Sequence, residues 1–360
     1  MKLLVVASPL GPLGGGAGGG VELTLVNLVA GLLQRGHRLT VLAAEGSSLP
    51  LDCAAAQLWT CPGNPQASLQ HQPRQAPISI AADGLLPRLW RRVLAEGPGL
   101  GFDAVLNLSS DWLPFWLTPT APLPIFHLVS MGSVHAALDQ EIRDLAQWDQ
   151  RRLAFHTRSQ AADFPLPYPP VVVGNGFDLQ AYGFCDQPEA LLGWVGRIAP
   201  EKGLEDAAAV AARLALPLAV WGLREDPAYA AAVEASVPAG TLQWRGFLPT
   251  AALQEQLGRC RALLNTPKWN EAYGNVVVEA LACGVPVVAY RRGGPAELVQ
   301  SGVTGELVEP DDVEALEAAV DRIASIDRAA CRRWVEQHAS RPVLAERIEG
   351  WLYAGLEPPG

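Results

Sequence analysis

Short apolar runs alternate with longer amphipathic segments along the first half of the chain. The apolar runs have the length of buried strands, and the amphipathic segments have the spacing of helices that cover one face of a sheet. The predicted strands are Leu3–Ala7, Leu39–Ala43, Ala104–Leu108, Pro124–Val129 and Leu153–His156, and the predicted helices are Val21–Arg35, part of Ile78–Leu94 and Ala136–Arg151. Strands joined by helical crossovers indicate a parallel sheet covered on both faces.

The same alternation starts again after Asp178. The predicted strands there are Ala190–Val195, Leu218–Trp221, Leu242–Phe247, Ala262–Asn265, Val285–Ala289 and Glu306–Val308, and the predicted helices are Gly203–Leu214, Thr250–Arg259, Asn275–Cys283, Pro295–Val299 and Val313–Ala324. Prolines in residues 164–170 disfavour a helix between the halves. Residues 46–77 show no clear period and are predicted to be loop-rich. We therefore expect an α/β protein with two doubly wound domains, residues 1–175 and 176–341.

Composition narrows the class of partner. The chain has 27 basic and 37 acidic residues and a net charge of −10, and its Arg-Arg pairs are isolated, so we expect no nucleic-acid binding. No apolar stretch reaches the ~18–20 residues of a membrane span, and the first apolar run is too short for a signal peptide. Six cysteines without CxxC spacing favour reduced thiols and no metal site. These features predict a cytoplasmic protein without an integral membrane segment.

A glycine-rich loop separates the first predicted strand from the first predicted helix. Glycines let backbone amides approach a phosphate, and a helix N-terminus favours negative charge. Gly14, Gly16 and Gly19 formally match the GxGxxG fingerprint of dinucleotide-binding proteins, and Glu45 ends the second strand. The fingerprint is weakly specific, because many registers match in such a glycine run. We predict a loop that faces a phosphate or closes over the site, and the alternatives are a nicotinamide-dependent oxidoreductase and a loop with no ligand.

The segment Gly196–Gly203 follows a predicted strand and opens a helix. It carries Arg197 and Lys202 between flanking glycines. A lysine at a helix start is unfavourable for the helix dipole unless an anion offsets it. We therefore predict that the two cations and the nearby amides bind a small diphosphate, whereas the alternative is a pair of solvated surface cations.

Two acidic residues flank the start of a later helix. Glu271 lies in the loop before the helix, and Glu279 lies one turn inside it. The backbone amides of Gly274, Asn275 and Val276 begin this helix. Two carboxylates so placed can bind hydroxyls at two ends of a ligand while the amides bind its phosphate. In isolation the same pattern is also typical of an ordinary polar helix face.

Taken together, these motifs resemble a known family over nearly the whole chain. The motifs, in order, are Gly19-Gly20-Val21-Glu22, Asn175-Gly176-Phe177-Asp178, Gly196-Arg197 with Lys202-Gly203, Arg245-Gly246-Phe247, Glu271 with Glu279, and Gly293-Gly294 with Glu297. The chain is similar to the family 4 retaining glycosyltransferases, which have the GT-B fold of two Rossmann-like domains facing a cleft. Ala272-Tyr273 and Phe177 depart from the usual family pattern, and neither departure affects a charged role.

The resemblance implies a nucleotide-sugar donor and a role for each matching residue. Arg197 and Lys202 hold the diphosphate, and Glu279 binds the ribose hydroxyls. Glu271 with the amides of Gly274 and Asn275 holds the transferred sugar. The remaining implied donor contacts come from Gly20, near the β-phosphate, and from Val276, Gly222 and Gly246–Leu248 with Phe247. His127 falls where the family often has a histidine facing the sugar, although a histidine after an apolar run is as often structural.

The family also implies the division of labour along the chain. Residues 1–175 form the acceptor-binding domain, residues 176–341 the donor-binding domain, and residues 342–360 a helix that crosses back to the first domain. No cofactor or metal is expected, since no Asp-x-Asp occurs. In the family the departing phosphate is thought to help deprotonate the acceptor.

The opening stretch Ser8–Leu25 looks closer still to UDP-glucose:tetrahydrobiopterin glucosyltransferases, which implies transfer of glucose from UDP-glucose to a reduced pterin. Asp111, Trp112, His127 and Ser130 are then candidates for acceptor contacts. A sugar or lipid acceptor is the alternative within the family. A non-catalytic, two-lobed sugar-binding protein is the alternative outside it.

Overall fold

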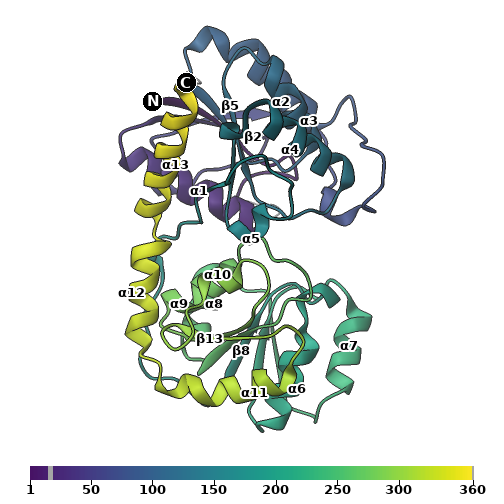
Figure 1. Cartoon of the computed structure of the whole chain (residues 1–360), viewed down its shortest axis with the longest axis vertical. Coiled ribbons are helices and arrows are strands. Elements are labelled where there is room, and N and C mark those ends of the chain that lie inside the picture. The colour runs from purple at the N-terminus through teal and green to yellow at the C-terminus, as the bar shows by residue number, and fades with distance from the viewer. Residues whose placement is uncertain (15–18, 359–360) are drawn as a thin grey trace. The chain divides into compact units, whose positions relative to one another are not determined.

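The structure, a computed structural model, describes residues 1–14 and 19–358. The chain divides into two compact units, one formed by Met1–Phe177 with Arg341–Gly360 and the other by Asp178–Ser340. Each unit is built around its own parallel sheet with helices on both faces (Figure 1). We describe each unit by itself below.

The described residues of the first unit form a seven-stranded parallel sheet in the order β3-β2-β1-β4-β5-β6-β7. The strands are β1 (Lys2–Val6), β2 (Arg38–Ala44), β3 (Gln57–Cys61), β4 (Ala104–Asn107), β5 (Ile125–Val129), β6 (Leu153–Phe155) and β7 (Val171–Val172). In the centre of the sheet, Val5 lies opposite Val41 on β2 and Leu106 on β4. The central strands are mostly apolar because both of their faces are buried, although β5 contains His127.

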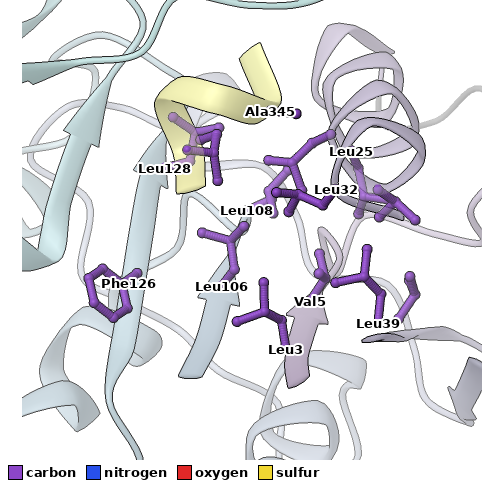
Figure 2. Close-up of a cluster of buried hydrophobic side chains, with 14 of the residues drawn as sticks. Leu3, Val5, Leu25, Leu32, Leu39, Leu106, Leu108, Phe126, Leu128 and Ala345 are labelled. Carbon is purple, nitrogen blue, oxygen red and sulfur yellow. The ribbon is translucent and has the colours of Figure 1, made fainter. Parts of the chain in front are cut away.

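Alternate residues of β1 contribute to two different hydrophobic clusters, one on each face of the sheet. Leu3 and Val5 pack under α1 (Gly19–Gln34) and α13 (Arg341–Leu356), together with Leu25, Leu32 and other apolar side chains (Figure 2). Leu4 and Val6 face the opposite side and pack under α2 (Leu85–Glu96). Successive side chains of a strand point to opposite faces, so a short apolar run serves both layers.

The C-terminal helix α13 belongs to the first unit and packs against α1 (Figure 1). The two helices approach closely at Gly31, where an added Cβ would lie 2.9 Å from the Cβ of Ala345. The Trp351 indole nitrogen donates to the carbonyl of Arg151 at 2.8 Å. The other helices of this unit are α3 (Trp112–Leu117), α4 (Ala136–Asp149) and α5 (Arg158–Ala161).

Most of residues 46–77 lie in loops, as expected, but the segment also holds a strand that the hydropathy pattern did not predict. The segment contains β3, which pairs with β2 from Gln57 to Cys61. This strand has a neighbour on one side only, and its burial pattern does not alternate. Because exposed and buried side chains do not alternate along β3, its sequence shows no period of two residues.

The described residues of the second unit form a six-stranded parallel sheet in the order β10-β9-β8-β11-β12-β13. The strands are β8 (Leu192–Val195), β9 (Leu218–Trp221), β10 (Leu242–Gly246), β11 (Ala262–Asn265), β12 (Val287–Tyr290) and β13 (Gly305–Val308). The helices are α6 (Leu204–Arg213), α7 (Pro227–Ala235), α8 (Thr250–Gly258), α9 (Asn275–Ala282), α10 (Pro295–Leu298), α11 (Val313–Arg322) and α12 (Arg328–His338). The hydropathy pattern predicted this sheet and most of these helices, but not α7 or α12.

The strand order reverses direction between β8 and β11, which lie side by side although they are not consecutive. Ligands of doubly wound sheets bind at such a point, beyond the carboxyl ends of the strands. Among the described residues, no helix has the length and apolar character needed to cross a membrane.

Candidate functional site

The loops that follow β8 and β11 pack against each other at the switch point of the second sheet. The Lys268 amide donates to the Glu201 carbonyl at 2.8 Å, and the Thr266 hydroxyl donates to the Gly203 carbonyl at 2.7 Å. Gly203 has a left-handed backbone (φ 66°), and a Cβ there would lie 2.0 Å from the Thr266 carbonyl oxygen. Only glycine permits this approach, so the glycine of the sequence motif joins the two loops.

Lys202 and Glu271, which come from these two loops, form an ion pair. The Lys202 ammonium lies 2.6 Å from Glu271 Oε2, and both side chains are about four-fifths covered. The Trp269 indole donates to the same carboxylate oxygen at 3.0 Å, and its ring centroid lies 4.6 Å from the ammonium. The structure therefore brings together two of the residues predicted from separate motifs. Trp269 was not predicted, although it stands two positions before Glu271 in the same loop.

Arg197 lies in the loop after β8 and pairs with two carboxylates. One guanidinium nitrogen lies 2.8 Å from Glu201 Oε1, and another contacts Glu225, which follows β9. The Arg197 side chain is 33% exposed, so an incoming ligand has access to it. Sequence reasoning missed Glu225, because neither its neighbours nor its spacing mark it as a partner of Arg197. An anionic ligand at this arginine competes with these carboxylates.

Gly293 and Gly294 pack closely against the backbone of the loop that carries Glu271. The Gly294 amide donates to the Glu271 carbonyl at 2.7 Å. A Cβ on Gly294 would lie 2.0 Å from the Tyr273 carbonyl oxygen, so a larger residue would displace the loop. This close packing explains the Gly293-Gly294 pair in the sequence and fixes the backbone that precedes α9.

Helix α9 begins after Gly274, which has a left-handed backbone (φ 98°) and provides no side-chain cap. The first turn, with Asn275 and Val276, places backbone amides and the positive end of the helix dipole at this end of the loop. Glu279 lies one turn further and is 8% exposed. Burial raises the pKa of Glu279 to about 7, and a hydrogen bond from Tyr182 partly opposes this shift. The site thus contains a carboxylate that titrates near neutral pH.

Gly246 and Phe247 lie at the carboxyl end of β10, two strands away from β8 in the sheet. The Gly222 amide donates to the Gly246 carbonyl at 3.0 Å, which joins the ends of β9 and β10. The Phe247 side chain is 66% exposed, which is unusual for a large aromatic residue. An exposed ring at this edge is available to stack on a planar ligand.

The acceptor candidates of the first unit fall on neighbouring strands. Asp111 and Trp112 follow β4, and Ser130 follows β5, so all three lie beyond the carboxyl ends of adjacent parallel strands. Asp111 caps α3 by accepting a hydrogen bond from the Trp112 amide at 2.8 Å, and burial raises its pKa to about 6. Ser130 is half-buried and contacts His156 Nε2 at 3.0 Å. Sequence reasoning missed His156, which follows β6.

His127 lies inside β5 rather than at its end, and its side chain is fully buried. Nδ1 lies 3.0 Å from the Asn107 amide nitrogen, and Nε2 lies 2.7 Å from the Thr118 hydroxyl, which itself donates to the Pro114 carbonyl. The ring stacks on Phe115 at 4.2 Å between centroids. Both ring nitrogens are occupied, and burial lowers the pKa of His127 to about 3. This geometry favours the structural interpretation of His127 over a catalytic role.

The glycine loop of the first unit is described only in part. The stretch 15–18, which includes Gly16 of the formal fingerprint, lies outside the described residues. Beside it, the Gly14 amide donates to Glu22 Oε1 at 2.6 Å. Gly20 lies in the first turn of α1, and its carbonyl accepts from the Thr24 hydroxyl at 2.9 Å. The contacts predicted for this loop with a ligand stay predictions.

Comparison with known sequences points to the second unit. Residues 184–341 match the family model of glycosyl transferases group 1. The chain is 34% identical over 161 residues to the D-inositol 3-phosphate glycosyltransferase of Mycobacterium sp. (strain KMS). That alignment covers 43% of this chain and 37% of the glycosyltransferase. It is 37% identical over 170 residues to the GDP-mannose-dependent alpha-mannosyltransferase of Mycolicibacterium smegmatis. That alignment covers 46% of this chain and 44% of the mannosyltransferase. The chain thus spans less than half the length of these curated relatives.

Comparison with solved structures covers both units. AviGT4, a glycosyltransferase involved in avilamycin A biosynthesis, has a TM-score of 0.72 at 21% identity, with 99% of this chain and 98% of that chain covered. Anabaena HepE in complex with UDP has a TM-score of 0.73 at 18% identity, with 98% and 100% covered. These similarities confirm the predicted fold class, namely the two parallel-sheet, Rossmann-like domains of the GT-B glycosyltransferases.

Proposed function

We propose that this chain, whose residues 184–341 match glycosyl transferases group 1, is a glycosyltransferase that uses a nucleotide-sugar donor. The observation that carries the proposal is the convergence of Arg197, Lys202 and Glu271 on two loops at the switch point of the second sheet. Cations, a carboxylate and a helix N-terminus in one place match the separate needs of a diphosphate and a sugar.

The donor diphosphate is assigned to Arg197, Lys202 and the first amides of α9. Negative charge grows on the diphosphate as the sugar leaves, and cations already in place stabilise that charge without reorganising. In the free enzyme, Glu225 and Glu201 accompany Arg197, and Glu271 accompanies Lys202. These carboxylates compensate the cations until the donor replaces them, which also leaves Glu271 available to the hydroxyls of the transferred sugar.

The remaining donor contacts are assigned to three further places in the second unit. Glu279 accepts from the ribose hydroxyls, since it is a nearly buried carboxylate one turn into α9. Phe247 and the backbone at Gly246 border the base.

We propose that the transfer retains the anomeric configuration and needs no metal, with the diphosphate itself assisting deprotonation of the acceptor.

The finer proposal concerns the two substrates. We propose UDP-glucose as donor and a hydroxyl of a reduced pterin as acceptor, with Asp111, Trp112 and Ser130 at the carboxyl edge of the first sheet as acceptor contacts. The resemblance of residues 8–25 to pterin glucosyltransferases supports this choice. Sugar and lipid acceptors are the competing substrates within the same chemistry. His127 is not part of this proposal, because its ring is enclosed in the core.

Product analysis tests the proposal at both levels. The enzyme is incubated with UDP- and GDP-sugars and with pterin, sugar and lipid acceptors, and the products are identified by mass spectrometry. Glycosylated product from any pair supports the enzyme class, and the pair that reacts fastest identifies the substrates. Nucleotide binding without transfer to any acceptor or to water contradicts catalysis. Binding of NADH without binding of UDP or GDP indicates the oxidoreductase alternative.

A further inference from the structure

A short segment at the start of the second unit runs along α9. This segment, residues 178–185, includes the turn Leu179–Ala181 and then Tyr182. The Tyr182 hydroxyl lies 3.5 Å from Glu279 Oε1. Beyond the helix end, the Cys185 amide donates to the Cys283 carbonyl at 3.1 Å. The segment therefore contacts α9 both at the Glu279 side chain and at the C-terminal end of the helix.

Arg332 of α12 fastens this segment to α9. Its guanidinium donates to the carbonyls of Leu179 at 2.7 Å, Tyr182 at 2.9 Å and Ala282 at 2.7 Å. Leu179 and Tyr182 belong to the segment, whereas Ala282 is the last residue of α9. One rigid, planar group thus fixes the Tyr182 backbone relative to the helix that carries Glu279.

Arg328, one turn earlier on α12, repeats this arrangement. It donates to the carbonyls of Cys185 at 2.7 Å, Gly258 at 2.6 Å and Cys260 at 3.0 Å. Both ends of the segment are therefore held by arginines of the same helix. A tyrosine on a backbone held at both ends has little freedom to move its hydroxyl away from Glu279.

We propose that Tyr182 is a positioning residue for the donor site, whose hydroxyl donates to Glu279 and holds its carboxylate in the orientation and charge state that bind the donor ribose. The inference rests on the proposed function, because it takes the ribose as the ligand of Glu279. Tyr182 is 5% exposed. Burial and the adjacent Glu279 raise the pKa of Tyr182, so the phenol keeps its proton and remains a donor.

The surroundings of Glu279 leave Tyr182 as its stabilising side-chain partner. Helix α9 packs against α8, α10, α12, β11 and β12. The titratable side chains on these elements and at the C-terminal end of α9 itself are Glu255, Glu297, Arg328, Cys331, Arg332, Arg333, Glu336, His338, Tyr290 and Cys283. Within the described residues, Tyr182 is the one side chain that hydrogen-bonds Glu279, and this bond lowers the pKa that burial raises.

The sign of the expected pH effect follows from this balance. Burial raises the pKa of Glu279 to about 7, so the carboxylate is ionised above that pH and neutral below it. The ionised form accepts from both vicinal ribose hydroxyls, whereas the neutral form has lost acceptor capacity. Removal of the Tyr182 hydroxyl raises the pKa of Glu279 further. Nucleotide affinity is then lost at a higher pH than in the wild type.

Calorimetric titration of four proteins tests the proposal. UDP, or GDP if it is the nucleotide that the wild type binds, and inorganic pyrophosphate are titrated between pH 6 and 9. The proteins are the wild type, Tyr182→Phe, Glu279→Gln and Tyr229→Phe. Tyr229 is the matched control, because its hydroxyl bonds a carboxylate of the same unit, Glu205, instead of Glu279.

Tyr182→Phe is expected to weaken nucleotide binding about fivefold at pH 7, the size of one ordinary hydrogen bond, because Glu279 is then less often ionised and less firmly oriented. It is also expected to move the midpoint of the pH dependence upward by about half a pH unit or more. Pyrophosphate lacks the ribose, so its affinity stays unchanged. Glu279→Gln is expected to remove the pH dependence, and Tyr229→Phe to follow the wild type.

Three results separate failure of the positioning role from failure of the proposed function. If Tyr182→Phe keeps the wild-type midpoint while Glu279→Gln weakens nucleotide binding, the positioning role is overturned and the donor site stands. The positioning role is also overturned if Tyr182→Phe weakens nucleotide and pyrophosphate equally, as general loss of structure would. If Glu279→Gln binds the nucleotide as tightly as the wild type, the ribose assignment in the proposed function is wrong, and the inference fails with it.

Discussion

The two units differ in where their predicted polar site residues lie. In the second unit they follow the ends of strands, whereas in the first unit one of them lies inside a strand. Lys202 and Glu271 lie in loops beyond β8 and β11, remain about one-fifth exposed, and pair with each other. His127 lies within β5, is fully buried, and has both ring nitrogens hydrogen-bonded. All three were predicted as site residues. The difference shows that a polar side chain inside a buried strand is enclosed, whereas these two loop side chains beyond strand ends stay partly accessible.

Glycine distinguishes the two regions further. In the second unit, Gly203 allows one loop to touch another, and Gly294 supports the Glu271 loop from below. No comparable glycine brackets His127, whose neighbours in the sequence are all apolar. Charged residues bracketed by glycines are therefore a stronger indication of a site here than one histidine after an apolar run. Four experiments probe this comparison, from the largest expected effect to the smallest.

Gly203→Ala tests whether the two loops of the second unit depend on close backbone approach. The new Cβ would lie 2.0 Å from the Thr266 carbonyl oxygen on a left-handed backbone. We expect the free energy of unfolding to fall by about 3–5 kcal/mol, since backbone strain and overpacking add. Urea denaturation measures it. Gly240→Ala is the control, because Gly240 is also left-handed but has no atom within 4 Å of an added Cβ.

Gly240→Ala should cost only about 1 kcal/mol, from the backbone term alone. Equal losses in the two variants would show that contact between the loops contributes nothing.

Arg197→Ala and Lys202→Ala test whether the exposed cations act on the donor. We expect turnover to fall about 100-fold or more in each, because stabilisation of the leaving diphosphate is lost. Steady-state kinetics with the best donor and acceptor measure it. Arg213→Ala is the control, because Arg213 forms a surface ion pair with Glu317 on the same unit. Wild-type turnover in either loop variant would contradict the diphosphate assignment.

The decrease of the free energy of unfolding between pH 7 and pH 4.5 tests whether His127 stays buried and neutral in the folded protein. Burial lowers its pKa to about 3 from an ordinary value near 6.5. Below pH 6.5, His127 therefore binds a proton in the unfolded chain but stays neutral in the folded protein. The free energy of unfolding is unaffected by this difference above pH 6.5 and decreases as the pH falls below it. Each such histidine contributes a slope of up to about 1.4 kcal/mol per pH unit.

Urea denaturation from pH 7 to pH 4.5 measures this slope. We expect a shallower slope in His127→Gln than in the wild type. A wild-type slope in His127→Gln would mean that His127 takes up a proton in the folded protein. The structural interpretation would then be wrong, and His127 would return as a site candidate.

Metal removal is expected to have the smallest effect. If Arg197, Lys202 and the α9 amides neutralise the diphosphate, no divalent cation is needed. Turnover after dialysis against EDTA should stay within about twofold of the untreated enzyme. A large loss that Mg²⁺ or Mn²⁺ restores would transfer the charge-stabilising role from these side chains to a metal.

The sequence by itself determined the two-sheet organisation and the loops that carry chemistry. Apolar runs between amphipathic segments specify buried parallel strands, because a strand covered on both faces is apolar along most of its length, as β1 is after Lys2. Glycines beside Arg197, Lys202 and Glu271 marked the strand-to-helix loops, because helix starts and close backbone approach have local requirements. The edge strand β3 and the helices α7 and α12 lack so clear a pattern and escaped prediction.

Only the tertiary structure decided which of these residues meet. Lys202 and Glu271 pair because β8 and β11 are neighbours in the sheet, and strand order is set by packing of the whole unit rather than by either loop. Glu225 and Tyr182 reach their partners from other elements for the same reason. His127 is enclosed because Phe115 and Thr118 fold over it. Local patterns encode elements and their ends, whereas contacts between distant segments depend on how the layers pack.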